Sequence, residues 1–507
     1  MKIKFYSKFI LASLLCCIAV VFTSCDDIFA SEDNPIASYL SMSDKDVTIK
    51  IGDTYKRTAI AVSGAVIEYS SSDETVATVD NEGTVTGISV GDATITATAT
   101  GYNTSGKKIY LAESKTYNVK VNPILAQSVT ITNPISTALF NETSTLTATV
   151  SPANTTDKSI TWSSDNTAVV TVDENTGIFT ALKSVGSAKI TATAVGGAKA
   201  SFTVVVGLLP GVFTVDNGTP AKKVQFAQGN LQYQASTNTW RIAENQYDYV
   251  GNNTFGNVYV GSTKCNNTYI SNTYTGWIDL FGWGTAGHSF TTGYGTAYQP
   301  WSISTTNVDY GPTDGTTGLT GIYSQGDWGT NIGENWYTLS QAEWVWLIGP
   351  KGSANPGTNC RTSSTINGVD NARYVKGIIN TDNGTGGIKG LILFPDVISI
   401  DDPVNAATNW GSINGGGGWN AQFTSEQWTK LAKKGCVFLP AAGYRGGITI
   451  TMLGGPYNDR MYSRYWSSTP DNTEGAKMVN FMDTDENPES YFSRSNGCSV
   501  RLVYPAQ

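Results

Sequence analysis

The stretch that decides the fold of this protein occurs twice. Residues 69–99, "YSSSDETVATVDNEGTVTGISVGDATITATA", recur as residues 162–194, "WSSDNTAVVTVDENTGIFTALKSVGSAKITATA", at an offset of 93 to 95 residues. Ile95, Ala97 and Ala99 alternate with threonines, so apolar and polar side chains fall on opposite faces of an extended segment. Each copy therefore predicts half-buried antiparallel strands.

The repeating unit is a domain, because solenoid repeats are only about 20 to 50 residues long. About seven short strands in each copy predict a sandwich of two sheets. The shared pattern resembles the group-2 bacterial immunoglobulin-like (Ig-like) family, whose members commonly serve as spacers in surface adhesins and enzymes. The resemblance implies Ig-like domains over residues 41–122 and 125–206. Tyr69 and Trp162, at equivalent positions, are expected in the two sandwich cores.

The N-terminus has the layout of a secretory signal. Lys2, Lys4 and Lys8 precede an apolar run over residues 9–22, and small residues follow. This run is shorter than the roughly 20 residues needed to span a bilayer. Residues 1–24 are therefore predicted to be a lipoprotein signal peptide that is removed from the mature protein.

Residues 22–25, "FTSC", resemble a bacterial lipobox, in which the cysteine is acylated and becomes the new N-terminus. Cys25 is then a membrane anchor, and residues 25–40 are a tether. Asp26 and Asp27 resemble the acidic export signal of surface lipoproteins in Bacteroides-type bacteria. The expected location is the outer membrane, with display on the cell surface.

Composition agrees with a mostly β, multidomain protein. Charged residues are 15% of the 507, against about 25% in an average soluble protein, and Gly numbers 53. The net charge is −8, and no Lys/Arg-rich run follows residue 8. Nucleic acid is therefore not an expected partner, because phosphate backbones are bound through clustered basic side chains.

Residues 212–507 differ from the repeats. They hold 12 of the 13 tryptophans among glycine-rich segments, which predicts one large, loop-rich domain. Two helices are expected, one over "LSQAEWVWLIG" with Ser340 as the cap, and one over "TSEQWTKLAKKG" with Ser425 as the cap and Gly435 at the end.

The motifs "VQFAQGNLQYQ", "GWIDLFGWGT", "EWVWL", "FLPAAGYR", "YWSST" and "SVRLV" resemble Bacteroides-type secreted domains with a C-type-lectin-like fold. That fold also occurs in formylglycine-generating enzymes and in the variable proteins of diversity-generating retroelements. The resemblance implies an α+β C-type-lectin-like domain over residues 212–507. It also implies that residues from "YWSST" to "SVRLV" form central strands, with Trp466 in the core, and that loops and outward side chains form the ligand face.

The loops around these strands are rich in Tyr, Asn and Arg, which make adaptable contact surfaces at a low entropy cost. Ordinary polar loops would show the same composition, and the sequence leaves both interpretations open. The candidates for ligand contact are Tyr457, Asn458, Arg460, Tyr462, Arg464, Asn472, Asn480, Tyr491, Arg494 and Asn496.

Four cysteines remain after processing: Cys265, Cys360, Cys436 and Cys498. An even number in an oxidising compartment allows up to two disulfides, although buried unpaired thiols are equally compatible with the sequence. Cys436 and Cys498 are the preferred pair because each opens a short apolar strand. No CxxC motif occurs and His288 is the single histidine, so no metal site and no cofactor are predicted.

Calcium-dependent lectins resembling this fold carry an acidic/Asn-Pro motif and a Trp-Asn-Asp triplet. The nearest matches here are "ENPES" and "GGWNAQ", where Ala421 replaces the acid, so sugar coordination through calcium is not expected. The acidic run at residues 483–489 lacks the spacing and glycine of an EF-hand and is expected to be a solvated loop. No catalytic residue is selected by any motif.

The sequence therefore predicts a lipid-anchored surface protein that binds an extracellular glycan or protein and is not an enzyme. One alternative is an enzyme of the formylglycine-generating fold or a glycan-degrading enzyme. A second alternative is a structural subunit of a surface assembly.

Overall fold

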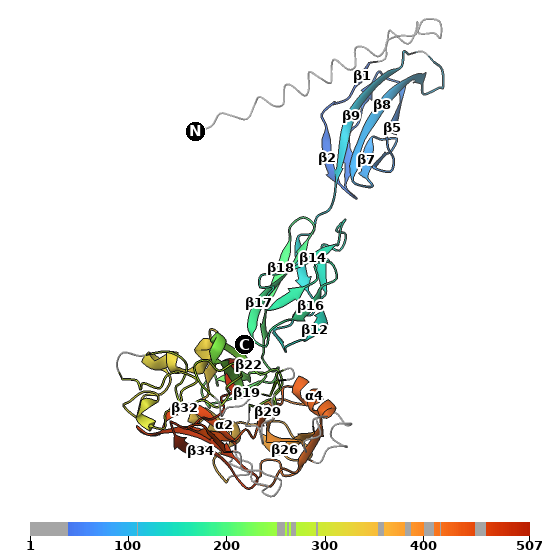
Figure 1. Cartoon of the computed structure of the whole chain (residues 1–507). Coiled ribbons are helices and arrows are strands. Elements are labelled where there is room, and N and C mark those ends of the chain that lie inside the picture. The colour runs from blue at the N-terminus through green and yellow to red at the C-terminus, as the bar shows by residue number, and fades with distance from the viewer. Residues whose placement is uncertain are drawn as a thin grey trace, which may run out of the picture. The chain divides into compact units, whose positions relative to one another are not determined.

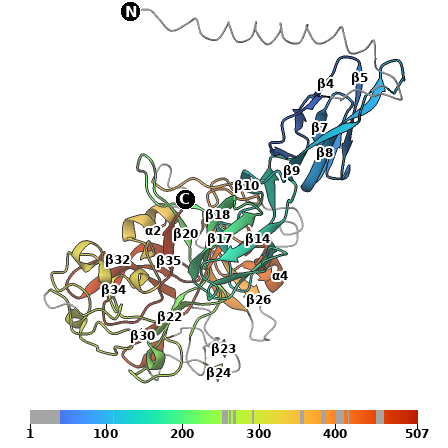
Figure 2. The ribbon, with the colours of Figure 1, turned by 90° about the horizontal axis from the view of Figure 1, so that it is seen from above.

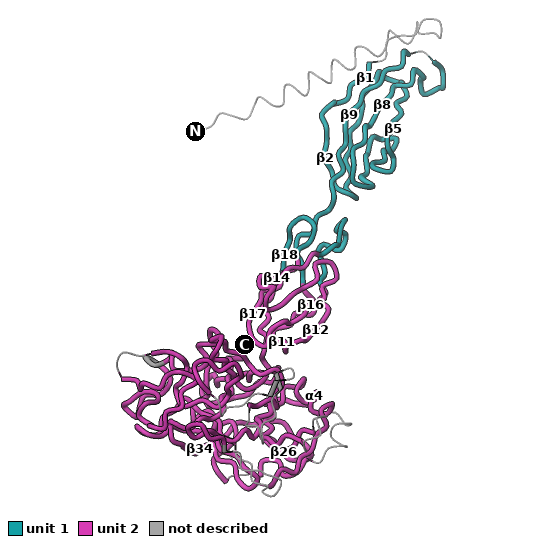
Figure 3. Tube along the Cα trace, viewed as in Figure 1, with its two compact units in different colours: residues 1–130, 148–160, 193–200 teal, residues 131–147, 161–192, 201–507 magenta. Residues whose placement is uncertain are grey.

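The computed structural model describes residues 39–108, 110–250, 259–260, 263–264, 270–289, 293–352, 359–380, 387–399, 410–415, 417–451 and 463–506. The predicted signal peptide and Cys25 lie outside the described residues. The chain divides into two compact units: residues 1–130, 148–160 and 193–200, and residues 131–147, 161–192 and 201–507 (Figure 3). None of the helices in the described part of the chain combines the length and the apolar character needed to cross a bilayer.

The first sandwich packs a four-stranded sheet, in the order β2-β9-β8-β5, with a three-stranded sheet, β3-β7-β6, and the pair β1-β4 (Figure 1). Its strands are β1 (Leu40–Ser41), β2 (Val47–Lys50), β3 (Thr54–Lys56), β4 (Ile60–Ala61), β5 (Ala65–Ser71), β6 (Ala77–Val79), β7 (Thr84–Gly87), β8 (Gly91–Asn103) and β9 (Glu113–Asn122). Along β8, residues 93, 95, 97 and 99 are buried and the threonines between them are half-buried, as the alternation predicted.

The second sandwich repeats this arrangement with the sheets β11-β18-β17-β14 and β12-β16-β15 and the pair β10-β13. Its strands are β10 (Ser128–Ile131), β11 (Thr137–Ala138), β12 (Thr143–Thr145), β13 (Ala148–Ser151), β14 (Ile160–Ser164), β15 (Val170–Val172), β16 (Ile178–Ala181), β17 (Gly186–Ala194) and β18 (Lys199–Val206). The prediction of two Ig-like sandwiches is confirmed.

Glycines at equivalent positions of the two sandwiches lie against the aromatic ring that each copy of the repeat contains. Gly83 and Gly177 have positive φ angles of 78° and 69°, and an added Cβ would lie 2.9 Å from the Tyr69 ring and from Trp162 Nε1, respectively. Any larger residue would be strained by its backbone and would push on the aromatic ring. Trp162 is buried as predicted, whereas Tyr69 is half-buried and its hydroxyl accepts a hydrogen bond from the Ala59 backbone N–H at 2.7 Å.

The C-terminal region is rich in β-structure and has few helices among its described residues. Its strands are β19 (Phe213–Thr214), β20 (Lys223–Phe226), β21 (Leu231–Gln234), β22 (Thr239–Ile242), β23 (Tyr259–Val260), β24 (Thr263–Lys264), β25 (Tyr337–Thr338), β26 (Tyr374–Asn380), β27 (Ile388–Leu393), β28 (Ala421–Thr424), β29 (Val437–Pro440), β30 (Tyr444–Gly446), β31 (Thr449–Thr451), β32 (Ser463–Pro470), β33 (Gly475–Phe481), β34 (Glu486–Ser493) and β35 (Leu502–Pro505). The helices are η1 (Ala235–Thr237), η3 (Asn307–Asp309), η4 (Gly321–Gly326), η5 (Trp328–Asn331), α2 (Gln341–Ile348) and α4 (Ser425–Lys433).

The larger sheets of this region are β19-β20-β35-β25, β28-β26-β27-β29 and β32-β33-β34. The last strand, β35, pairs with β20 near the start of the region, so the two ends of the region close one sheet. In Figures 1 and 2, the β32-β33-β34 sheet lies on one side of the region, and β26 with α4 lies on the other.

Both predicted helices are present. Ser340 caps α2 in a capping box with Glu343, as the sequence indicated. The cap of α4 is Thr424 and not Ser425, because the Thr424 hydroxyl accepts the Gln427 N–H while the Gln427 side chain reaches back to the Thr424 N–H. The predicted cap of this helix was therefore one residue away from the observed cap.

The resemblance implied that this segment forms central strands; in the sheet β32-β33-β34 only β33 is central, and β32 lies at one edge. Tyr465, Val479 and Phe481 pack into one core cluster, while Trp466 and Met478 pack into another. Trp466 is fully buried and its indole N–H donates to the Phe281 carbonyl at 2.6 Å. Because both faces of these strands are buried, they offer few outward side chains for a ligand.

The segment that joins the second sandwich to the C-terminal region is buried. Leu208 and Leu209 are at most 1% exposed, and the Leu209 N–H donates to the Phe226 carbonyl at 2.9 Å. Val205, at the end of β18, belongs to the same core cluster as Trp466. The end of β18 and the joining segment, which belong to the second compact unit, therefore share hydrophobic core with the C-terminal region.

Buried arginines hold the loops of the C-terminal region. Arg361, Arg373, Arg445, Arg494 and Arg501 are all at most 2% exposed. Their guanidinium groups donate chiefly to backbone carbonyls of segments that are distant in sequence. A guanidinium has five N–H donors in a fixed fork, so one side chain can satisfy several loop carbonyls that lack a strand partner.

Candidate functional site

The ten candidate ligand residues differ in how exposed they are in the structure, and four of them lie outside the described residues. Tyr457, Asn458, Arg460 and Tyr462 lie outside the described residues. Of the remaining six, Asn472 and Tyr491 are exposed, Arg464 and Asn496 are half-buried, and Asn480 and Arg494 are buried.

The interpretation of Arg494 as a ligand contact is wrong. Its side chain is fully buried, donates to the carbonyls of Gly475, Tyr310 and Pro312, and lies 4.6 Å from the centre of the Trp283 ring. Burial lowers the pKa of this guanidinium to about 10. Arg494 therefore holds a loop to the sheet and does not face solvent.

Arg464 lies against two aromatic rings that contact each other. Its guanidinium carbon lies 4.2 Å from the centre of the Tyr444 ring and 3.7 Å from that of Phe492. Asn480 is its cross-strand partner on β33, but only 8% of Asn480 is exposed. Asn496 lies in the turn that follows β34, where its N–H donates to the Ser493 carbonyl at 3.0 Å. Stacking pre-organises Arg464, while the burial of Asn480 makes it part of the scaffold.

One group of the candidates does form a surface cluster. Tyr491 on β34 is 62% exposed, and the Lys477 ammonium lies 5.7 Å from the centre of its ring. Lys477 makes a 2.5 Å ion pair with Asp471, whose other carboxylate oxygen accepts from the Asn472 amide at 2.9 Å. Asn472 also caps its own turn by accepting the Glu474 and Gly475 N–H groups at 2.8 Å.

We call Asp471, Asn472, Lys477 and Tyr491 the Tyr491 cluster. It combines an exposed ring on the edge strand β34 with a cation on the neighbouring strand β33, and with a carboxylate and an amide in the turn before β33. Sequence reasoning found Asn472 and Tyr491 but missed Lys477 and Asp471. A lone lysine in the apolar segment "GAKMVNF" was the signal for Lys477, since such a residue needs an anionic partner or solvent.

The predicted disulfide between Cys436 and Cys498 is not formed in this structure. Both cysteines are free and fully buried; Cys436 belongs to the core cluster of Trp428 and Phe438, whereas Cys498 belongs to that of Trp466. Burial raises the pKa of both thiols, to about 12 for Cys498. The pairing was predicted because each cysteine stands at the start of a short apolar strand. That position does not bring the two cysteines together, because the two strands contribute to different parts of the core.

The acidic run at residues 483–489 is less solvated than predicted. Glu486 is 7% exposed, pairs with the buried Lys376 ammonium at 3.1 Å and accepts from the Tyr374 hydroxyl at 2.7 Å. Burial and the neighbouring Glu486 carboxylate raise the pKa of Tyr374. Within the described ranges, no group of three or more His, Cys, Asp or Glu side chains is placed to hold a metal ion.

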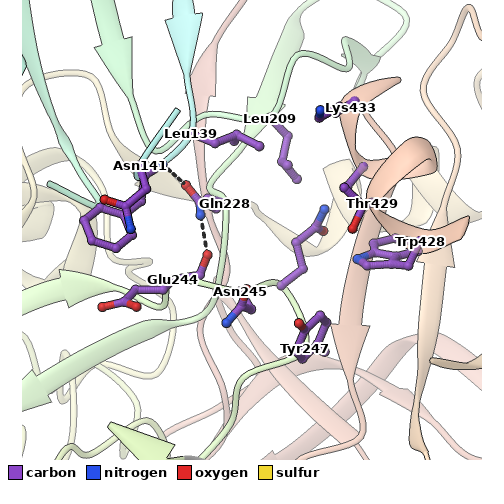
Figure 4. A pocket seen from close by; sticks show the side chains of 13 residues that line it. Leu139, Asn141, Leu209, Gln228, Glu244, Asn245, Tyr247, Trp428, Thr429 and Lys433 are labelled. Carbon is purple, nitrogen blue, oxygen red and sulfur yellow. Dashed lines mark hydrogen bonds between the residues drawn. The ribbon is translucent and has the colours of Figure 1, made fainter. Parts of the chain in front are cut away.

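A cavity of about 290 Å³ opens beside α4, where the loop after β11 meets the C-terminal region (Figure 4). Gln228 and Gln246 form buried parts of its lining. Gln228 accepts from the Phe140 N–H at 2.9 Å and donates to the Glu244 carbonyl, so it joins the sandwich loop to the C-terminal region. The cavity is lined by Leu139, Phe140, Asn141, Leu209, Gln228, Glu244, Asn245, Gln246, Tyr247, Trp428, Thr429, Ala432 and Lys433.

Two curated proteins are similar in sequence to part of this chain. An uncharacterised protein of Clostridium acetobutylicum is 31% identical over 172 residues, which cover 33% of this chain and 16% of that protein. A second uncharacterised protein of the same organism is 38% identical over 85 residues, covering 17% of this chain. The chain thus spans only 16% and 21% of the lengths of these two relatives.

Solved structures match about a third of the chain. Domains 4 and 5 of the S-layer protein SbsC are 18% identical, with 34% of this chain and 98% of that chain covered and a TM-score of 0.18. The C-terminal fragment of intimin, solved with the intimin-binding domain of its translocated receptor, is 17% identical, with 32% and 59% covered and a TM-score of 0.16. Residues 38–109 and 125–204 match the bacterial Ig-like domain (group 2) family, so the chain contains two bacterial Ig-like domains.

Proposed function

We propose that this protein is a bacterial cell-surface lipoprotein that binds an extracellular glycan or protein through its C-terminal region. In this proposal Cys25 carries the lipid anchor in the outer membrane, the two Ig-like domains act as a spacer, and the C-terminal region is a C-type-lectin-like binding domain. The N-terminal pattern and the two Ig-like domains support surface display, because domains of this family are typical of bacterial surface proteins.

The Tyr491 cluster is the observation that carries the binding role. A tyrosine that is 62% exposed on an edge strand gains little from folding, since most of its apolar surface stays in water. The same ring supplies a large contact area at low entropy cost when a partner covers it. The ion pair between Lys477 and Asp471 holds the neighbouring polar groups in fixed positions.

The cysteines support binding rather than catalysis of the formylglycine-generating type. That chemistry uses paired reactive cysteines, and reactivity needs the thiolate. Cys436 and Cys498 lie in separate core clusters, and burial raises the pKa of both thiols. A binding protein is the function that these residues favour.

Replacing the anchor residue tests the proposed location. In cells that make the full chain, the Cys25→Ala variant is expected to leave the membrane fraction and appear in the soluble fraction, because the thiol that would be acylated is gone. Fractionation followed by immunoblotting measures this. Ser24→Ala is the control, since it keeps the thiol. A Cys25→Ala protein that stays with the membranes would contradict the anchor.

Removing the Tyr491 cluster tests the binding role. Cells displaying the full chain are tested on glycan arrays and on extracellular-matrix proteins, beside cells displaying Tyr491→Ala/Lys477→Gln. Binding is expected to fall at least about tenfold, or about 1.4 kcal/mol, because the variant removes the aromatic ring and the neighbouring cation that would contact the ligand.

The matched control is Tyr102→Ala, which removes a tyrosine that is 46% exposed in the first sandwich. Equal binding by the wild type and the double variant, with both displayed at the same level, would rule out this cluster as the contact surface.

A further inference from the structure

We propose that the cavity beside α4 binds a neutral saccharide no larger than a disaccharide. This site is separate from the Tyr491 cluster and does not depend on surface display. Its volume of about 290 Å³ is just below the range of about 300–1,000 Å³ that is typical of small-molecule sites. The site therefore suits a compact ligand.

Aromatic rings and polar groups both line the cavity. Phe140 and Tyr247 are half-buried, and Trp428 is buried. The C–H faces of a pyranose pack on such rings, while its hydroxyl groups both donate and accept hydrogen bonds. In Figure 4, Asn141 and Glu244 lie on one side of the cavity, and Thr429 and Lys433 on α4 lie on the other.

These polar side chains keep hydrogen-bonding capacity for a ligand. The Thr429 hydroxyl donates to the Ser425 carbonyl at 2.8 Å, and its oxygen can still accept. The Asn245 amide nitrogen donates to Asp248 at 3.1 Å, and its carbonyl oxygen is left to accept. The Asn141 side chain has no hydrogen-bond partner among the residues that the structure describes, and Asn141 is exposed.

The charges of the lining favour a neutral ligand. Glu244 is its single carboxylate and Lys433 its single ammonium, and both side chains are exposed. A carboxylate accepts from sugar hydroxyls and an ammonium donates to them, whereas a charged ligand would be attracted by one and repelled by the other.

The floor of the cavity is already fixed. Gln246 donates to the Cys436 carbonyl at 3.0 Å and accepts from the Phe438 N–H at 2.6 Å, and the Gln228 amide likewise makes one donated and one accepted hydrogen bond. A ligand would not have to order these groups, so little of the binding free energy is lost to conformational entropy. The site is pre-organised for a weak to moderate sugar ligand.

The test uses the purified Cys25→Ala variant of the chain, with cellobiose, maltose, lactose and N,N′-diacetylchitobiose as probes. Saturation-transfer NMR and isothermal titration calorimetry measure binding. At least one disaccharide is expected to bind, and Asn141→Gly/Thr429→Val is expected to weaken that binding at least about tenfold. Asn141 has a φ of 62°, so glycine removes the amide without straining the backbone.

Two controls make the result specific. Asn335→Gly makes the same change at another exposed position with a φ of 70° and should bind as the wild type does. Tyr491→Ala/Lys477→Gln should also keep disaccharide binding. The inference is overturned if none of the four probes binds at millimolar concentration, if Asn141→Gly/Thr429→Val binds normally, or if the Tyr491 variant loses the binding, which would place the sugar at the other site.

Discussion

Deleting the second Ig-like domain is expected to destabilise the C-terminal region by several kcal/mol. A fragment of residues 212–507 would lack Val205, Leu208 and Leu209, of which the two leucines are at most 1% exposed in the whole chain. Fully burying one such side chain contributes about 1.5–3 kcal/mol, and a native protein has a net stability of only about 5–15 kcal/mol. The lost burial free energy is therefore a large share of the net stability of the C-terminal region.

The measurement compares urea unfolding of three fragments, residues 125–507, 204–507 and 212–507. The fragment starting at 204 restores the buried segment, including the Leu209 hydrogen bond to Phe226, but not the bond between Phe140 and Gln228. We expect the midpoint to be highest for 125–507, intermediate for 204–507 and lowest for 212–507. Equal midpoints for the longest and shortest fragments would mean that the sandwich is only a detachable spacer.

Replacing Arg501 is expected to destabilise the C-terminal region by about 3–5 kcal/mol. Arg501 is 1% exposed and donates to Asn230 Oδ1 at 3.0 Å and to the carbonyls of Ala227, Gln246 and Phe438 at 3.1, 3.2 and 2.7 Å. Arg501→Met removes the guanidinium donor from all four buried acceptors, of which Asn230 Oδ1 keeps the Tyr465 hydroxyl. Burial lowers the pKa of this guanidinium to about 10, so it is still protonated at neutral pH.

The Arg501→Lys variant tests whether stability depends on the positive charge of the side chain or on the geometry of its guanidinium group. A lysine keeps the charge but has one ammonium in place of a fork, so it cannot reach four acceptors on three separate segments, and we expect a loss of similar size. Lys223→Met, at an exposed position on β20, is the control and should change stability by no more than about 0.5 kcal/mol. Equilibrium urea unfolding measures all three. An Arg501→Met protein as stable as the control would show that the carbonyls find other partners.

The candidate site was predicted only in part, for reasons that particular residues show. Tyr491 and Asn472 were selected from composition, and both are exposed. Arg494 was selected by the same criterion and is fully buried, because arginine serves equally as a surface contact and as an internal donor to backbone carbonyls. Composition does not distinguish these roles, since the carbonyls that Arg494 satisfies are distant in sequence.

The cavity beside α4 could not have been found from the sequence. Asn141, Glu244 and Thr429 have no common motif or spacing, and they meet only because the loop after β11 packs against the C-terminal region. The bond between Phe140 and Gln228 joins residues 88 positions apart. Contacts of this kind depend on how folded elements pack.

What the sequence determined by itself was local or repeated: the two sandwiches, from an alternating pattern with matching glycines, and the two helices, from spacing and caps. These features are fixed by interactions between near neighbours along the chain, where side-chain periodicity shows which face is buried. Tertiary structure alone decided that Cys436 and Cys498 stay apart, that Arg494 is internal and that Val205 belongs to the core of the C-terminal region. The physical reason is that burial depends on packing between distant segments, and a polar side chain can be buried wherever those segments supply its hydrogen bonds.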